Sequence, residues 1–245
     1  SNQTRGASGV AAPSSVPASR SASVSQESRR EPLSAVRKAT ADAMVASAFS
    51  APHASEWVTV DVSESVALLE RMRKDPAFHE IPVSILVLAA RAVCLALRRN
   101  EIVHAQWDGD AIVHPAHLGL GIAAATERGL LVPVVPAAET LSTPELAQTI
   151  HSLVSTAREG RLQPEQMTGG TFTITNVGIY GVDGGTPILP PGQSGILALG
   201  AVVRRPWVDE ETDQIVPRWV MTLSMSFDHR VVDGEPASKF LANVA

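Results

Sequence analysis

Continuous apolar runs constrain the fold of this chain more than any other feature of its sequence. They cover residues 118–126 and 130–135, and further strand-like segments occur at 171–176, 196–202 and 219–227. Runs of this length are typical of strands that are covered on at least one face. Helical patterns occur between them, but without a strict alternation of strand and helix. The sequence therefore predicts an α/β or α+β fold in which a mixed sheet is backed by helices.

The helices are predicted from apolar periodicity and from their boundary residues. One helix face is formed by Leu33, Val36, Thr40 and Met44. Further helices are expected over 66–73, 82–99 and 142–160, with a last one after Gly234. Ser142 and Glu145 fit a capping box. Asp108-Gly109 predicts a hairpin between 103–107 and 111–114.

Composition excludes several functional classes. With 20 basic and 25 acidic residues among 245, the formal net charge of −5 argues against a general nucleic-acid binder. The single cysteine, Cys94, excludes an internal disulfide and a multi-thiolate metal site, and it favours a reducing, cytoplasmic location. The longest apolar run, 81–97, carries Arg91 near its middle and is too short to span a membrane. We therefore expect no nucleic-acid or membrane partner.

The first 31 residues differ in composition from the rest of the chain. Eighteen of them are Ser, Ala, Pro or Gly, and Val10, Val16 and Val24 are their only branched aliphatic residues. Such a segment buries too little apolar surface to offset the entropy lost on ordering. We predict a flexible linker over 1–31 and a single domain over 32–245.

Several motifs suggest chemistry but fail on context. Gly119–Ala124 matches a dinucleotide-binding pattern, but it lies inside a strand-like run and does not open a helix. The glycine-rich loop 178–195 lacks the Gly-Lys-Ser/Thr of a phosphate-binding loop, and no Gly-x-Ser-x-Gly elbow is present. His114 and His117 have no carboxylate at ligand spacing, so we predict no metal site.

One constellation remains, at the end of a long apolar strand. His229 and Asp233 bracket Arg230-Val231-Val232, and Gly234 follows. A histidine at a strand end is rigidly held, and a tight turn after it brings a charged partner close to its ring. The alternative interpretation is that Asp233 caps the final helix while His229 only packs beside it. The motif alone leaves both interpretations open.

A second candidate lies where the strand 171–176 ends before the glycine loop. Thr175 supplies a hydroxyl and Asn176 an amide, at a sheet edge where donors meet a ligand. The alternative is an ordinary transition from strand to turn, because Asn-x-Gly is common in turns.

Taken together, these motifs resemble the catalytic domain of the dihydrolipoamide acyltransferases, the core components of 2-oxo-acid dehydrogenase complexes. The resemblance covers about 210 residues, from Leu33 to Ala245, and its motifs occur in the family's order. They are 33–38 with Met44, 52–53, 107–109, 121–123 with 128–134, 169–176, 190–191 leading to 196–200, and 228–234.

The resemblance implies an α/β, CoA-dependent acyltransferase fold like that of chloramphenicol acetyltransferase. It also implies a homotrimer or larger core with active sites in channels between subunits. The implied substrates are coenzyme A and a lipoyl group. The implied partners are the lipoyl domain and the decarboxylase and dihydrolipoamide dehydrogenase components of the complex.

The matching positions also imply roles for single residues. His229 is the expected general base, Asp233 its structural supporter, and Thr175 the hydroxyl donor to the oxyanion. The CoA contacts implied by the resemblance are Arg91, Asn176 and Gly200. We expect Asp233 to pair with an arginine, and Arg37 is the first candidate.

The chain departs from the family pattern at several positions. Ala125 stands where an aspartate is common, which puts one polar contact to CoA in doubt. Thr175 replaces a serine, which keeps the donor and adds a methyl group. The last helix of the family usually continues past Ala245, so we expect a shortened C-terminus. No Asp-Lys-Ala lipoylation site is present, so the lipoyl group is expected on a domain outside this chain.

The expected activity is acyl transfer between a dihydrolipoyl arm and CoA. The Asn176-Val177-Gly178 loop favours an acetyl or branched-chain acyl group over succinyl. Two alternatives remain open: an O- or N-acyltransferase of the same fold, and a non-catalytic structural core subunit.

Overall fold

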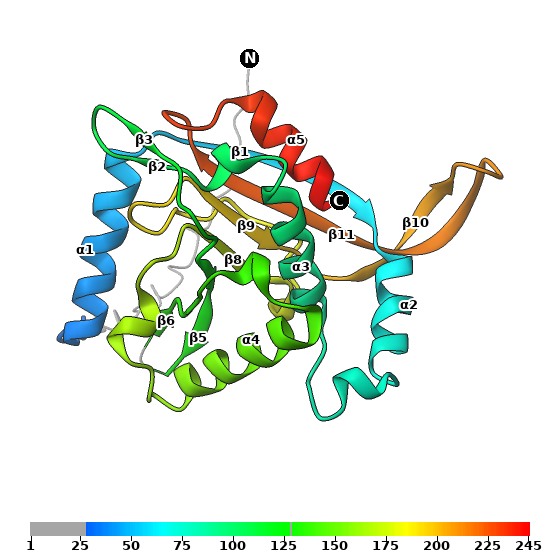
Figure 1. Cartoon of the computed structure of the whole chain (residues 1–245), viewed down its shortest axis with the longest axis horizontal. Helices are drawn as coiled ribbons and strands as arrows, with labels where there is room; N and C mark the ends of the chain where they lie inside the picture. The colour runs from blue at the N-terminus through cyan, green and yellow to red at the C-terminus, as the bar shows by residue number, and fades with distance from the viewer. Residues whose placement is uncertain (1–27, 128) are drawn as a thin grey trace, which may run out of the picture. The chain divides into compact units, whose positions relative to one another are not determined.

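A seven-stranded mixed sheet organises the structure, a computed structural model that describes residues 28–127 and 129–245 (Figure 1). Its strands are β1 (His53–Asp61), β4 (Leu120–Ile122), β7 (Val134–Val135), β8 (Phe172–Asn176), β9 (Gly195–Leu199), β10 (Val203–Asp209) and β11 (Gln214–Asp228). The order is β1-β11-β9-β8-β4-β7, and β10 pairs with the first half of β11. Strands β4, β8 and β9 are parallel, whereas β11 runs antiparallel to β1, β9 and β10. The carboxyl end of β11 therefore lies where β8 and β9 begin, and the carboxyl ends of β8 and β9 lie together at the opposite end of the strands.

Helices cover one face of this sheet and enclose the main core. They are α3 (Ile85–Leu97), α4 (Thr143–Arg158) and α5 (Gly234–Val244). Their buried residues pack against alternate strand residues such as Ile174, Leu197 and Met225. Phe172 and Phe240 join sheet and helix, with ring centroids 5.2 Å apart. The predicted mixed sheet backed by helices is thus confirmed.

The remaining elements lie around the sheet. They are α1 (Ala35–Ser50), α2 (Ser63–Met72), the hairpin β2 (Gln106–Trp107) and β3 (Ile112–Val113), and the hairpin β5 (Ala124–Thr126) and β6 (Gly129–Leu131). Short 3-10 turns occur at Pro76–Phe78, Glu101–His104, Ala138–Thr140, Pro164–Met167 and Gly178–Tyr180. The capping box at Ser142 and Glu145 is present at the start of α4, as predicted.

Some boundaries differ from the sequence prediction. Helix α3 begins at Ile85 and not at 82, with Ser84 at its N-cap. The run 118–126 divides into β4 and β5, and the run 196–202 ends its pairing at Leu199. Strand β10 was not predicted, because it mixes charged and apolar residues around Pro206, a composition typical of an edge strand. Residues 1–27 of the predicted linker lie outside the described residues.

The described residues contain neither a membrane-spanning helix nor a metal-binding cluster. No helix there is both long and apolar enough to cross a bilayer. Within 28–127 and 129–245, no group of three or more His, Cys, Asp or Glu side chains is arranged to hold a metal ion.

The single cysteine is buried in α3, and burial raises the pKa of the Cys94 thiol to about 11. At pH 8 this lowers its thiolate fraction roughly 100-fold compared with an ordinary thiol. We expect Cys94 to resist a maleimide in the native protein and to react within minutes after unfolding, as measured by mass spectrometry. Rapid labelling of the native protein would contradict this placement.

Candidate active site

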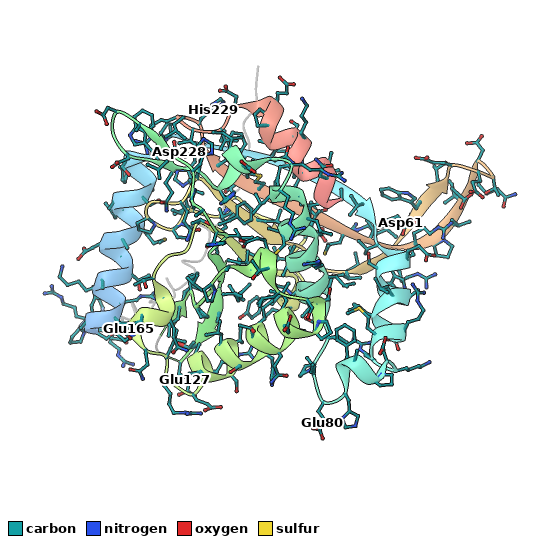
Figure 2. The ribbon with its side chains drawn as sticks, viewed as in Figure 1. Asp61, Glu80, Glu127, Glu165, Asp228 and His229 are labelled. Atoms are coloured by element: carbon teal, nitrogen blue, oxygen red, sulfur yellow. The ribbon has the colours of Figure 1, made fainter. Side chains whose placement is uncertain are left out.

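His229 lies one residue beyond β11, where the strand leads into α5, and Figure 2 shows it beside Asp228 at this point. Its backbone N–H donates to the Pro52 carbonyl at 2.9 Å, which attaches the turn to the start of β1. The imidazole is about half exposed and packs on the Phe227 ring at a centroid distance of 5.6 Å. The residue is thus held by its backbone while its ring remains accessible.

The turn that carries His229 is stabilised by a charged pair that the sequence did not reveal. Arg230 donates from Nε and Nη2 to both carboxylate oxygens of Asp228, at 3.0 and 2.6 Å for the shorter contacts. Asp228 is only 2% exposed. Its hydrogen bonds, reinforced by its charge, hold the pKa of Arg230 above the ordinary value. The guanidinium also lies over the Trp107 ring, 5.1 Å from its centroid, which connects the turn to the β2–β3 hairpin.

Asp233 is placed differently from the prediction. Its carboxylate is 3.8 Å from Nδ1 of His229, beyond hydrogen-bond distance, and its side chain is 86% exposed. It stands at the N-cap of α5 without donating or accepting a side-chain capping bond. Among the described residues, Asp233 forms no ion pair with Arg37, so that prediction is wrong within one chain. The arginine pair at this turn forms with Asp228 instead, because Asp228 ends the strand inside the core whereas Asp233 begins a helix at the surface.

Thr175 and Asn176 lie at the other edge of the sheet, at the carboxyl end of β8. The Asn176 side-chain carbonyl accepts from the Gly178 N–H at 3.0 Å, so the amide closes the turn that was the alternative interpretation. The Thr175 hydroxyl makes no side-chain hydrogen bond within the described part of the chain.

Gly200 follows β9 at the same edge and is buried. A Cβ on Gly200 would lie 2.0 Å from the Asp183 carbonyl oxygen, and one on Gly178 would lie 2.2 Å from the Gly200 carbonyl oxygen. Close backbone packing therefore requires glycine at both positions. This packing is a structural reason for Gly200 that does not depend on CoA.

Within one chain, Thr175 and His229 do not meet. Thr175 pairs with Ala198, which pairs with Ser224, and His229 follows Ser224 by five residues, just beyond the end of β11. At about 3.3 Å per residue and about 4.8 Å per strand spacing, the two residues are about 19 Å apart. One chain in this arrangement therefore does not bring the two residues into a single catalytic centre.

A cavity of about 760 Å³ lies on the sheet face opposite the main core, between the sheet, α1 and the loop 187–193. Thr173 and Thr175 face this cavity, because they alternate with the core residue Ile174. Most of the other side chains around it are apolar, among them Met44 and Leu131. Its size and apolar lining are typical of a small-molecule site.

Arg91 lies on α3, on the helix-covered side of the sheet, and is partly buried. Its Nη1 donates to the Leu141 carbonyl at 3.1 Å. It therefore does not join Thr175 at the cavity, and the structure brings only Thr175, Asn176 and Gly200 to one edge.

The dinucleotide-like segment and the two histidines have structural surroundings of their own. Gly119–Ala124 forms part of β4 and β5 and opens no helix. His117 contacts Glu139, with Nδ1 2.8 Å from a carboxylate oxygen, and it is largely exposed. Glu139 lies 22 residues from His117 along the chain, outside the short ligand spacing on which the sequence prediction rested.

The Asp233 side chain permits a prediction. Because it does not hydrogen-bond to the ring, Asp233→Asn should reduce kcat for the acyl transfer that the family resemblance implies less than about tenfold. Steady-state kinetics with acetyl-CoA and free dihydrolipoamide measure this. A loss as large as that of a His229 variant, with the fold intact, would mean that Asp233 has a direct chemical role.

Asp228→Asn is the matched substitution on the other carboxylate. It removes the charge partner of Arg230 at a buried position, so the free energy of unfolding should fall by about 2–3 kcal/mol. Urea unfolding of both variants should therefore separate a structural carboxylate, Asp228, from an exposed one, Asp233.

Comparisons with known proteins bear on this arrangement. The family model for the 2-oxoacid dehydrogenases acyltransferase (catalytic domain) matches residues 25–245. The chain is 36% identical over 219 residues to the acetyltransferase component of the acetoin cleaving system of Bacillus subtilis, covering 88% of this chain and 54% of that protein. It is 41% identical over 187 residues to the succinyltransferase component of the 2-oxoglutarate dehydrogenase complex of Bartonella vinsonii, covering 76% and 45%. The chain thus spans about half the length of the curated relatives it matches.

Solved structures agree with this match. A dihydrolipoamide acetyltransferase of Azotobacter vinelandii, studied for the catalytic role of a serine, a histidine and an asparagine, superposes with a TM-score of 0.84 at 26% identity, covering 89% of this chain and 90% of that one. The cubic core of a pyruvate dehydrogenase multienzyme complex gives 0.82 at 26% identity over the same shares. Chloramphenicol acetyltransferase, at 16% identity and a TM-score of 0.53 over 79% of this chain and 87% of its own, shows the shared fold alone. The predicted fold is confirmed.

Proposed function

Because the chain belongs to the 2-oxoacid dehydrogenase acyltransferase family, matching its catalytic domain over residues 25–245, we propose that it transfers an acyl group between a dihydrolipoyl arm and the thiol of CoA. The observation that carries this proposal is His229, whose ring is half exposed while its backbone is fixed at the end of β11. An accessible imidazole on a rigid support is what proton transfer to and from a thiol requires.

The proposed chemistry begins at His229. A thiol is a weak nucleophile at neutral pH until it is deprotonated, so a neutral imidazole next to the CoA sulfur takes that proton. The thiolate attacks the carbonyl carbon of the S-acyl-dihydrolipoyl group, and a tetrahedral oxyanion forms. The protonated imidazole then returns the proton to the dihydrolipoyl sulfur as the original C–S bond breaks. Atoms and charge balance without an acyl-enzyme.

Thr175 is the proposed donor to the oxyanion. Its hydroxyl faces the cavity and has no side-chain partner among the described residues, so it is available to the substrate. A preorganised donor of this kind accelerates acyl transfer by about 100- to 1,000-fold. The study of the Azotobacter enzyme concerned a serine, a histidine and an asparagine four positions after that histidine. Thr175 and His229 supply the same two chemical groups, a hydroxyl and an imidazole. Asp233 is four positions after His229 here.

The assembly proposed for this chemistry is a homotrimer or a larger core. The separation of about 19 Å between Thr175 and His229 in one chain supports a site shared by two subunits. A channel between subunits also admits two long, flexible substrates from its two ends. The similar cubic core supports further assembly.

The remaining parts of the proposal follow from the family. Asn176 and Gly200 are proposed contacts of CoA, and the lipoyl group is carried on a domain outside this chain. The proposed partners are that lipoyl domain and the decarboxylase and dihydrolipoamide dehydrogenase components. We further propose a linker over 1–31, a catalytic domain over 32–245, and, from the single buried cysteine, a cytoplasmic location.

Acyl transfer from acetyl-CoA or isobutyryl-CoA to free dihydrolipoamide tests the function. We expect saturable transfer, measured by chromatography of the acylated product. Transfer to a hydroxyl or amine acceptor but not to dihydrolipoamide would favour the O- or N-acyltransferase alternative. A trimer without transfer to any acceptor would favour a structural core subunit.

A further inference from the structure

We infer that the cavity next to Thr175 selects an uncharged acyl group and rejects one that ends in a carboxylate. The inference rests on the proposed function, because it takes the Thr175 hydroxyl as the donor to the reacting carbonyl. The acyl chain attached to that carbonyl then lies against the wall of the cavity. Both an acetyltransferase and a succinyltransferase are similar to this chain, so similarity alone does not decide the acyl group.

The wall nearest Thr175 is apolar. The Ala123 N–H donates to the Ile174 carbonyl at 2.9 Å, which places Ala123 beside Thr175 on the neighbouring strand, and Ala123 also lines the cavity. Val132 lies next to Thr173, because a Cβ built on Gly121 would meet both side chains, at 2.9 and 2.4 Å. An acyl chain at Thr175 therefore contacts methyl groups.

Among the described residues, the cavity offers no counter-charge to a carboxylate. None of the described residues that line it is Lys, Arg or His, and its polar members are neutral threonines and Gln193. The Gln193 side-chain carbonyl already accepts from the Thr173 hydroxyl at 2.7 Å. A carboxylate moved from water into such surroundings without a cation is strongly disfavoured. An acetyl or branched-chain acyl group is uncharged, so it places no charge in this cavity.

The second half of the shared site adds negative charge. In the proposed trimer, the His229 turn of a neighbouring copy completes the site. The only arginine of that turn, Arg230, is paired in a bidentate manner with Asp228. Asp233 is 86% exposed and has no arginine partner in the described residues. The turn therefore supplies no unpaired arginine to an acyl carboxylate.

Donor specificity tests the inference with the chain as it is. Acetyl-CoA, isobutyryl-CoA and succinyl-CoA are each used to acylate free dihydrolipoamide, and kcat/KM is measured. We expect the value for succinyl-CoA to be at least about 100-fold below that for acetyl-CoA. Comparable values for the two would overturn this inference and leave the proposed function standing. Absence of transfer from every donor would overturn the proposed function, and the inference with it.

A single charge tests the physical cause. Ile188 lines the cavity and is 43% exposed, so Ile188→Lys adds a cation at the rim without burying it. We expect the succinyl-to-acetyl ratio of kcat/KM to rise about tenfold. Leu95→Lys makes the same change on the exposed side of α3, at a residue that is 47% exposed and outside the cavity, and should leave the ratio unchanged. An unchanged ratio in Ile188→Lys, or an equal rise in both variants, would overturn the inference.

Discussion

Replacing His229 with alanine is expected to lower kcat for acyl transfer by about 1,000-fold or more, because the thiol and the leaving sulfur then lack their acid and base. The fold should persist, since the turn is held by the backbone contact to Pro52 and by the Asp228–Arg230 pair, neither of which uses the imidazole. Steady-state kinetics with acetyl-CoA and dihydrolipoamide measure the loss. Circular dichroism and CoA binding should match the unmodified protein.

His151 provides the matched control, because it is an exposed histidine on α4 outside the proposed site. His151→Ala should keep full activity under the same conditions. If His229→Ala turned over at a rate near that of this control, the proposed mechanism would have to be abandoned.

The position of His229 could be predicted from sequence, whereas its support could not. The long apolar run before it identified a strand, and the histidine at its end followed directly. Which carboxylate pairs with an arginine depends on which one the fold buries. Asp228 and Asp233 are the same residue type, five positions apart. Asp228 is 2% exposed, whereas the side chain of Asp233 is 86% exposed. Trp107, which lies under Arg230, is distant in sequence and gives no local signal.

Thr175 shows the same division between local and long-range information. Its place at a strand end before a glycine loop was predicted correctly, because β-branched residues and glycine mark both features. Its distance from His229 depends on the order β11-β9-β8 and on the antiparallel direction of β11. Sequence patterns fix neither, because strands of one sheet can be paired in many orders. The register is what indicates that one chain holds only half of the proposed site.

The second large effect concerns this division of the site between two subunits. Mixing inactive His229→Ala with inactive Thr175→Ala protein, under conditions that let subunits exchange, should restore activity to about a quarter of the unmodified level. In random trimers, about one interface in four joins an intact Thr175 to an intact His229 of its neighbour. Each variant alone should be at least about 100-fold reduced, so the recovery is easily measured.

Exchange has to be shown independently, because unmixed trimers would give no recovery for a trivial reason. Differently tagged copies of the two variants, separated by successive affinity steps and counted by native mass spectrometry, identify the hybrids. Mixing two separately tagged His229→Ala preparations is the matched control and should restore nothing. If purified hybrids stay as inactive as the separate variants, Thr175 and His229 must act within one chain. The separation of about 19 Å would then require the chain itself to rearrange before catalysis.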